Sequence, residues 1–127
     1  MKINKSIDIE EEIRAALAPY MTAYVRPLPA EYDLPHILIT QVGGTRSQTI
    51  DTFAVVLDSR ARSEMEALEY LNRAVAILEQ SAREQVGALR HATLNSSGSW
   101  GSDPVRPDLA MCSARIEVVA HQTIEEV

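Results

Sequence analysis

Two apolar runs on either side of a glycine pair constrain the fold more than any other feature of this sequence. The runs are PHILITQV at 35–42 and DTFAVVLDSRA at 51–61. The first run has three consecutive apolar residues (37–39), which is typical of a strand covered on both faces. The second run is its natural antiparallel partner. The sequence therefore predicts two neighbouring strands in a mainly antiparallel sheet.

The connection between these strands starts with Gly43 and Gly44 and runs for about eight residues, GGTRSQTI. A phosphate-binding loop requires the pattern G-x-x-x-x-G-K-[ST] followed by a helix, whereas this glycine pair leads into a strand and has no lysine within reach. A loop this long exceeds a tight hairpin turn. We therefore expect an arm that projects from the body and contacts another subunit or a partner protein. The residues predicted to make this contact are Gly43, Gly44, Thr45, Arg46, Ser47 and Gln48.

A long helix is expected from Ser63 to Val86. Ser63 and Glu66 form the capping box S-x-x-E at its start, and Gly87 is a suitable stop. Its apolar stripe recurs at spacings of three and four, and consists of Leu68, Leu71, Val75, Leu78, Ala82 and Val86. A coiled coil would show the same stripe, but here it lasts only about three heptads, the lower limit for such a structure, and strand-like runs flank it. Packing across a sheet is therefore favoured.

A shorter helix is expected near the N-terminus, where Asp8 is a good N-cap and three glutamates fill the first turn (10–12). Its apolar positions follow helical spacing and are Ile9, Ile13, Ala16 and Leu17. Tyr24 and Val25 then suit a strand, which the nearby prolines 27 and 29 push to a sheet edge. The sequence thus predicts an α+β fold: a mainly antiparallel sheet with one long helix and a short N-terminal helix packed against it.

The C-terminal third reads as a strand over 88–97, a loop over 97–108 and a long final strand over 109–123. The final strand alternates an apolar and a mainly polar face, and its single cysteine, Cys112, is expected to be a small buried hydrophobe. The loop is rich in Gly, Ser and Pro and holds the only tryptophan, Trp100. Trp100 is expected to be either an interface anchor or a lid over the core. The acidic tail, IEEV, is expected to fray.

Composition excludes several classes of protein. The 127 residues are 46% hydrophobic, which fits a single domain over 1–127 with its own core. No apolar stretch reaches the length of a membrane span, and the N-terminus turns acidic where a signal peptide would be apolar, so we expect a cytoplasmic protein. The net charge is −6 and the 12 basic residues are scattered, which argues against nucleic-acid binding.

No pattern predicts catalysis or a cofactor. The three histidines, His36, His91 and His121, lack metal-binding spacing, and no nucleophile elbow of the form G-x-S-x-G occurs. We therefore predict no catalytic, cofactor-binding or metal-binding residues and no enzyme activity, although active sites do assemble from distant positions.

The order of the expected elements resembles that of the tail-terminator (tail-completion) proteins of long-tailed bacteriophages. The part of the chain that carries this resemblance is the string LPHILITQVGGTRSQTIDTFAVVLDSRARSEMEALEYLNRAVAILEQ. The ending DPVRPDLAMCSARIEVVA is also similar, and the resemblance covers about residues 9–120. It implies a subunit of a hexameric ring that caps the tail tube, stops its polymerisation and offers a face to the head connector. The implied partners are further copies of the chain, the tail tube protein and a head-completion protein; the implied location is the virion tail or neck, after assembly in the host cytoplasm.

A ring needs two different patches that meet head to tail. The arm and the loop around Trp100 are the positions that the resemblance carries over as contact surfaces. Arg46, Arg60 and Arg62 could meet acidic residues of a neighbouring subunit, such as those at 10–12 or at 31 and 33. Two alternatives stay open at this point: a head-closure or neck component of the virion and, in a different class, a small α/β ligand-binding module or enzyme.

Overall fold

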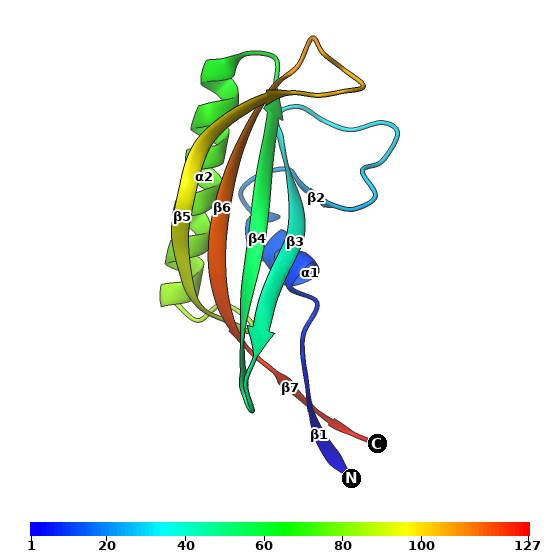
Figure 1. Cartoon of the computed structure of the whole chain (residues 1–127), viewed down its shortest axis with the longest axis vertical. Coiled ribbons are helices and arrows are strands. Elements are labelled where there is room, and N and C mark those ends of the chain that lie inside the picture. The colour runs from blue at the N-terminus through cyan, green and yellow to red at the C-terminus, as the bar shows by residue number, and fades with distance from the viewer.

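A five-stranded sheet with both helices on one face forms the body of the protein (Figure 1). The computed structural model describes residues 1–127. Along the chain the elements are β1 (Lys2–Lys5), α1 (Ile9–Leu17), β2 (Ala23–Val25), β3 (His36–Arg46), β4 (Ile50–Ala61), α2 (Glu64–Arg83), β5 (Leu89–Ser102), β6 (Ala110–His121) and β7 (Thr123–Glu126). The sheet order is β2-β3-β4-β6-β5, and β1 pairs with β7 in a separate two-stranded ribbon. All pairs are antiparallel except β2–β3, so the predicted α+β fold is confirmed.

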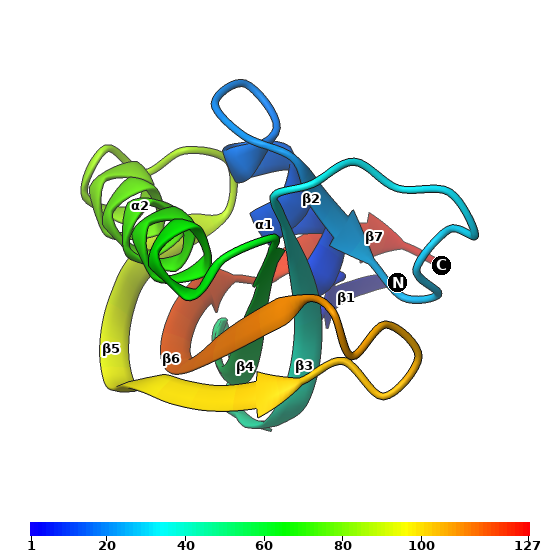
Figure 2. The same ribbon diagram turned by 90° about the horizontal axis from the view of Figure 1, so that it is seen from above.

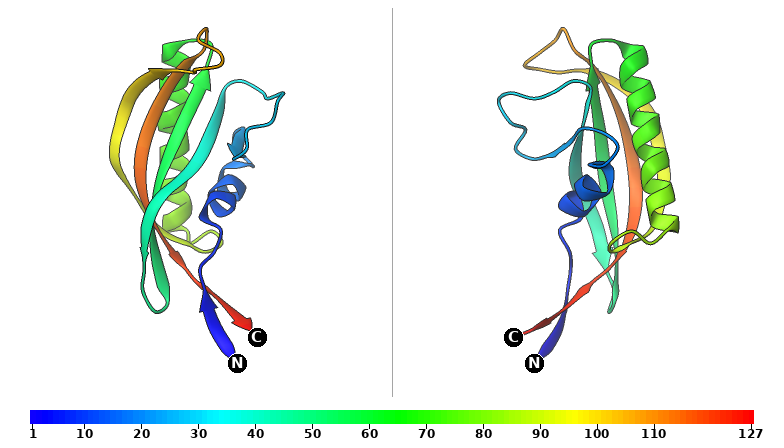
Figure 3. Two further views of the ribbon diagram at one scale, coloured as in Figure 1. Left: turned by 45° about the vertical axis from the view of Figure 1, so that its right-hand side comes forward. Right: turned by 180° about the vertical axis from the view of Figure 1, so that it is seen from behind.

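Both helices begin at the caps that the sequence predicts. The Asp8 carboxylate accepts a hydrogen bond from the Glu11 N–H (3.3 Å), and the Ser63 hydroxyl accepts one from the Glu66 N–H (3.2 Å). All four apolar positions predicted for α1 are buried. Viewed from behind, α1 and α2 lie side by side against the same face of the sheet (Figure 3). The expected packing of the long helix across a sheet is therefore confirmed.

The buried stripe of α2 differs in part from the prediction. Leu68 and Val86 are 37% and 43% exposed, whereas Ala67 and Ala74 are fully buried. Alanine is small enough to fill a position where helix and sheet lie close together, but it contributes little to a hydrophobic pattern, so sequence reasoning overlooked these two positions.

The helix α2 is also shorter than predicted. It ends at Arg83, and the first residue after it with positive φ is Gln85 (56°), not Gly87.

The core lies between the helices and the inward side chains of the central strands. Along β4 every second residue is buried, from Asp51 to Ala61, and the predicted apolar face of β6 is no more than 2% exposed at any of its five positions. Cys112 belongs to this face and is fully buried, as expected. Viewed from above, the sheet curves around the helices and leaves its other face without a helix (Figure 2).

The connection between β3 and β4 is shorter than predicted. β3 continues through both glycines to Arg46, so the turn contains only residues 47–49. A bulge between Gln41 and Gly43 shifts the register and lets the glycines pair with Ala54 and Phe53. The predicted eight-residue loop is thus wrong, although the hairpin does extend past both helices as a projection (Figure 3).

Two assignments in the C-terminal third also need correction. β5 runs to Ser102, so Trp100 lies in a strand and not in a loop. Small side chains gave this segment a loop-like composition, and bulges around Ser96 and a positive φ at Gly98 accommodate it in the sheet. The tail that was expected to fray forms β7 with β1. The edge position predicted for the strand at 24–25 is confirmed.

The two glycines of the hairpin are predicted to respond differently to substitution. A Cβ on Gly44, whose φ is +156°, would lie 2.6 Å from the Thr52 carbonyl oxygen, whereas the nearest atom to a Cβ on Gly43 is 3.9 Å away. Gly44→Ala should lower the free energy of unfolding by about 1–3 kcal/mol, because the backbone must strain or move. Gly43→Ala is the matched control and should change it by less than about 1 kcal/mol. Urea denaturation measures both, and equal effects would contradict this assignment.

Candidate contact surface at the distal end

The β3–β4 hairpin turn and the β1–β7 ribbon lie together at one end of the molecule, which we call the distal end (Figure 1). The Asn4 side chain donates a hydrogen bond to the Gln48 carbonyl oxygen (2.8 Å). The Gln122 amide donates to the Ser47 carbonyl oxygen (3.0 Å). The turn of the hairpin is thus joined to the base of the ribbon.

Arg46 connects the hairpin to β1 and to Ser6, just after it. Its guanidinium donates to the Ser6 hydroxyl (3.5 Å) and to the Asn4 carbonyl oxygen. The side chain remains exposed, so the predicted contact residue is available to a partner but already orders the distal end internally. The neighbouring predicted contact residues (43–48) are all exposed as well.

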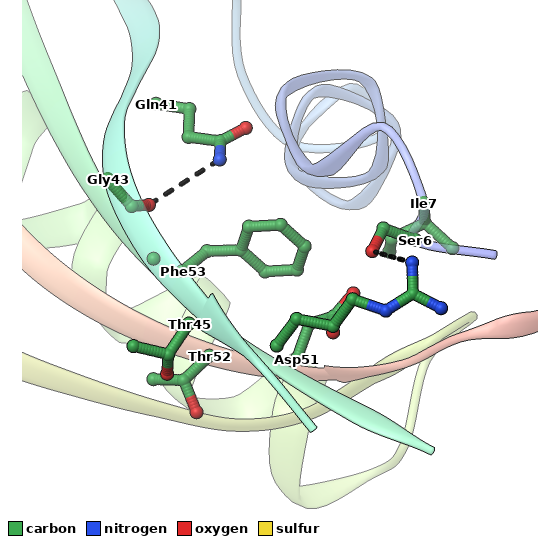
Figure 4. Close-up of a pocket in the computed structure, with 10 residues that line it drawn as sticks. Ser6, Ile7, Gln41, Gly43, Thr45, Asp51, Thr52 and Phe53 are labelled. Carbon is green, nitrogen blue, oxygen red and sulfur yellow. Dashed lines mark hydrogen bonds between the residues drawn. The ribbon is translucent and has the colours of Figure 1, made fainter. Parts of the chain in front are cut away.

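A cleft opens between the strands of the hairpin and the segment Ser6–Ile7, with a volume of about 380 Å³ (Figure 4). Phe53 forms its floor and is only 6% exposed. Asp51 lies beside it, 3% exposed, and accepts a hydrogen bond from the Gln122 amide (2.7 Å). The lining of the cleft is thus mostly polar, with a single aromatic ring. Because both glycines are paired in the β3–β4 ladder, this region is not a phosphate-binding loop.

Arg60 is not a surface contact residue, which corrects the prediction. Its Nε donates to Asp103 Oδ2 at 2.9 Å, and the two side chains are only 11% and 8% exposed. The other Asp103 oxygen accepts the N–H groups of Val105 and Arg106. Arg60 therefore holds the turn that opens the β5–β6 connection. The sequence alone does not distinguish a buried, paired arginine from a surface arginine, because the partner of Arg60 lies 43 residues away.

His36 lies next to this ion pair and is completely buried. It is the cross-strand neighbour of Arg60. The rings of Tyr24 and Tyr32 pack edge-on against the imidazole, with distances between ring centroids of 5.3 and 4.8 Å. Its Nδ1 lies 2.9 Å from the Asp33 carbonyl oxygen. Burial is the main cause that lowers the pKa of His36, and Arg60 lowers it further, while the Asp33 hydrogen bond and the Asp103 charge act in the opposite direction.

The remaining predicted contact residues do not come together with the distal end. Arg62 is exposed two residues before the start of α2 and makes no ion pair. Trp100 is 47% exposed on the edge strand β5, so it is not a buried lid. The acidic residues 10–12, proposed as partners for a neighbouring subunit, each have a partner within the chain.

Sequence reasoning missed the β1–β7 ribbon completely. KINK and TIEE are four residues each, and each is too short and too polar for a strand signal. The only available signal was opposite charge at the two chain ends, now visible as the ion pair between Lys5 and Glu125 (3.4 Å).

No group of three or more His, Cys, Asp or Glu side chains is placed to hold a metal ion. None of the helices combines the length and apolar character needed to span a membrane. No family model matches the chain, and no curated protein matches it.

Loss of the Arg60 side chain is predicted to be strongly destabilising, since it leaves the Asp103 carboxylate buried without its charged partner. Arg60→Ala should lower the free energy of unfolding by about 3 kcal/mol. Arg62→Ala, two residues away and exposed, should change it by no more than about 0.5 kcal/mol. Chemical denaturation of both variants checks this. An Arg60→Ala protein as stable as Arg62→Ala would show that the ion pair does not hold the β5–β6 connection.

The buried His36 predicts a loss of stability in mild acid. Its pKa in the folded protein lies below the ordinary value of 6.5, so the unfolded chain binds a proton that the folded protein does not. The contribution of neutral His36 to the free energy of unfolding should therefore be fully present above about pH 6.5. It should decrease as the pH falls below this value and level off below the folded-state pKa. In thermal melts between pH 7 and 5, His36→Gln should show a shallower dependence than the native protein. Parallel curves would contradict the assignment.

Proposed function

We propose that the chain is a structural subunit of a bacteriophage tail. In this proposal, copies of it form a hexameric ring that caps the tail tube, ends tube polymerisation and forms the tail side of the head–tail joint. The sequence resemblance to tail-terminator proteins supports this proposal, and the confirmed α+β fold is compatible with it. Its partners would be further copies of the chain, the tail tube protein and a head-completion protein.

The observation that supports the proposal most directly is the exposure of the distal end. Two pairs of strands extend past both helices (Figure 3), and the residues of the hairpin from Gln41 to Thr49 are all exposed. Folding gains little from ordering exposed residues, since they bury almost no apolar surface. Extended elements of this kind are suited to contacts between subunits, because they reach a neighbour without disturbing the core.

The surface chemistry fits contact with protein better than contact with nucleic acid. The chain carries 18 acidic and 12 basic residues, and of the three arginines predicted to meet a neighbour, only Arg46 and Arg62 are exposed. Exposed charges at a subunit interface contribute mainly to specificity and to the rate of association. Arg62, which has no partner within the chain, is the better candidate for such a contact.

The mass of the purified protein in solution tests the proposal. Light scattering coupled to size exclusion should give six times the chain mass of 14.0 kDa, and negative-stain micrographs should show closed rings. Addition of the protein to the tube protein of the same phage during polymerisation should shorten the tubes in proportion to dose. A monomer that is stabilised by a small molecule would favour the ligand-binding alternative.

A ring that leaves tube length unchanged, but binds a head connector, would instead favour the head-closure alternative. The dose series separates these outcomes, because a terminator acts on tube ends and a head-closure protein does not.

A further inference from the structure

We propose that the β1–β7 ribbon of one copy docks on the free edge of β5 in the next copy and extends its sheet. This inference rests on the proposed ring and names the two surfaces that build it. Neither surface was identified from the sequence, apart from Trp100.

The two edges of the five-stranded sheet are protected to different degrees. At the β3 edge, β2 pairs with Ile37–Ile39, and the N–H of Gln41 donates to the Glu10 carboxylate of α1 (2.8 Å). At the other edge, β5 has β6 on one side and no strand on the other over its whole length. A row of backbone groups in β5 is therefore available for pairing.

The second half of β5 lacks the charges and prolines that protect many edge strands. From Ala92 to Ser102 it contains no charged residue and no proline, two of the devices that prevent edge pairing in monomers; a third, the β-bulge, occurs on both sides of Ser96 but not in the last four residues. Its last four residues, Ser99–Ser102, pair with β6 in regular register. Leu94 and Trp100 are 41% and 47% exposed. The upper part of β5 thus combines a regular free edge with uncovered apolar side chains.

The β1–β7 ribbon has the complementary property. It has two strands of four residues, and such an isolated pair is at best marginally stable in water. Nearly all of its side chains are exposed, including Ile124 at 73%. Its two outer edges have no strand beside them. Docking on another sheet would bury Ile124 and give the ribbon the additional strands that it needs.

The positions of the two surfaces favour a ring over a symmetric pair. The ribbon leaves the body on the side away from β5 (Figure 1), so both surfaces of one copy can be occupied at once by different neighbours. Contacts between two different patches continue from copy to copy, and they form a ring when the rotation between neighbouring copies closes. Pairing of β5 with β5 of a second copy would instead give a two-fold dimer and leave both ribbons uncovered.

Crosslinking tests this contact on the full-length chain. The variants are Ser99→Cys, Ile124→Cys and the two together, treated with a flexible bis-maleimide. The native Cys112 is fully buried and burial raises the pKa of its thiol, so the unsubstituted protein is the unreactive control. The double variant should give a ladder of covalent oligomers that stops at the ring size, and each single variant should stay monomeric on denaturing gels.

A charge on the β5 edge provides a second measurement. Ser99→Lys should raise the concentration needed for half-maximal assembly by about tenfold or more. Ala76→Lys, on the exposed face of α2, is the matched control and should leave assembly unchanged. Both variants should melt as the native protein does, since both positions are exposed.

The outcomes separate this inference from the proposed function. Native rings that give no ladder and tolerate Ser99→Lys would overturn the docking contact and leave the ring proposal intact. Dimers formed by Ser99→Cys alone would overturn it in favour of β5–β5 pairing. A native protein that stays monomeric at all concentrations would overturn both the ring and the contact.

Discussion

The structure depends on the full-length pairing of β4 at the centre of the sheet. Every residue of β4 from Ile50 to Ala61 has a partner in β6, and its other side pairs with β3. Its inward side chains form the middle of the core, and its outward Arg60 anchors the β5–β6 connection. The same strand continues into the projecting hairpin at one end and leads into α2 at the other. One strand therefore determines the register of the core, the position of the long helix and the direction of the distal end.

The elements predicted correctly are those whose signal is local. Capping by Asp8 and Ser63 depends on residues within one helical turn, and the alternation in the final strand appears within ten residues. Both patterns reflect the geometry of an isolated helix or strand, so a single sequence contains them. The fold class follows from the order of such elements.

The errors share the opposite cause, because they depend on contacts between residues distant in the sequence. The pairing of Arg60 with Asp103 and of β1 with β7 is created only by the complete fold. Strand pairing also kept Trp100 in β5, against a loop-like local composition. For the candidate site, the sequence did locate the projecting hairpin. It did not locate the ribbon beside it, since two segments of four mostly polar residues, each with one isoleucine, carry no periodicity.

The edge strand β5 combines an unprotected edge with bulges that limit it. An unprotected edge is a risk for aggregation, yet β5 is interrupted by bulges on both sides of Ser96, which twist a strand and limit the length of any straight edge. Only short strands of matching length can then pair with it. The ribbon has four residues in each strand, as does the regular segment at the end of β5. In the proposed ring, such a short match would favour pairing between neighbouring copies, because many weak contacts act together there, over random pairing of free chains.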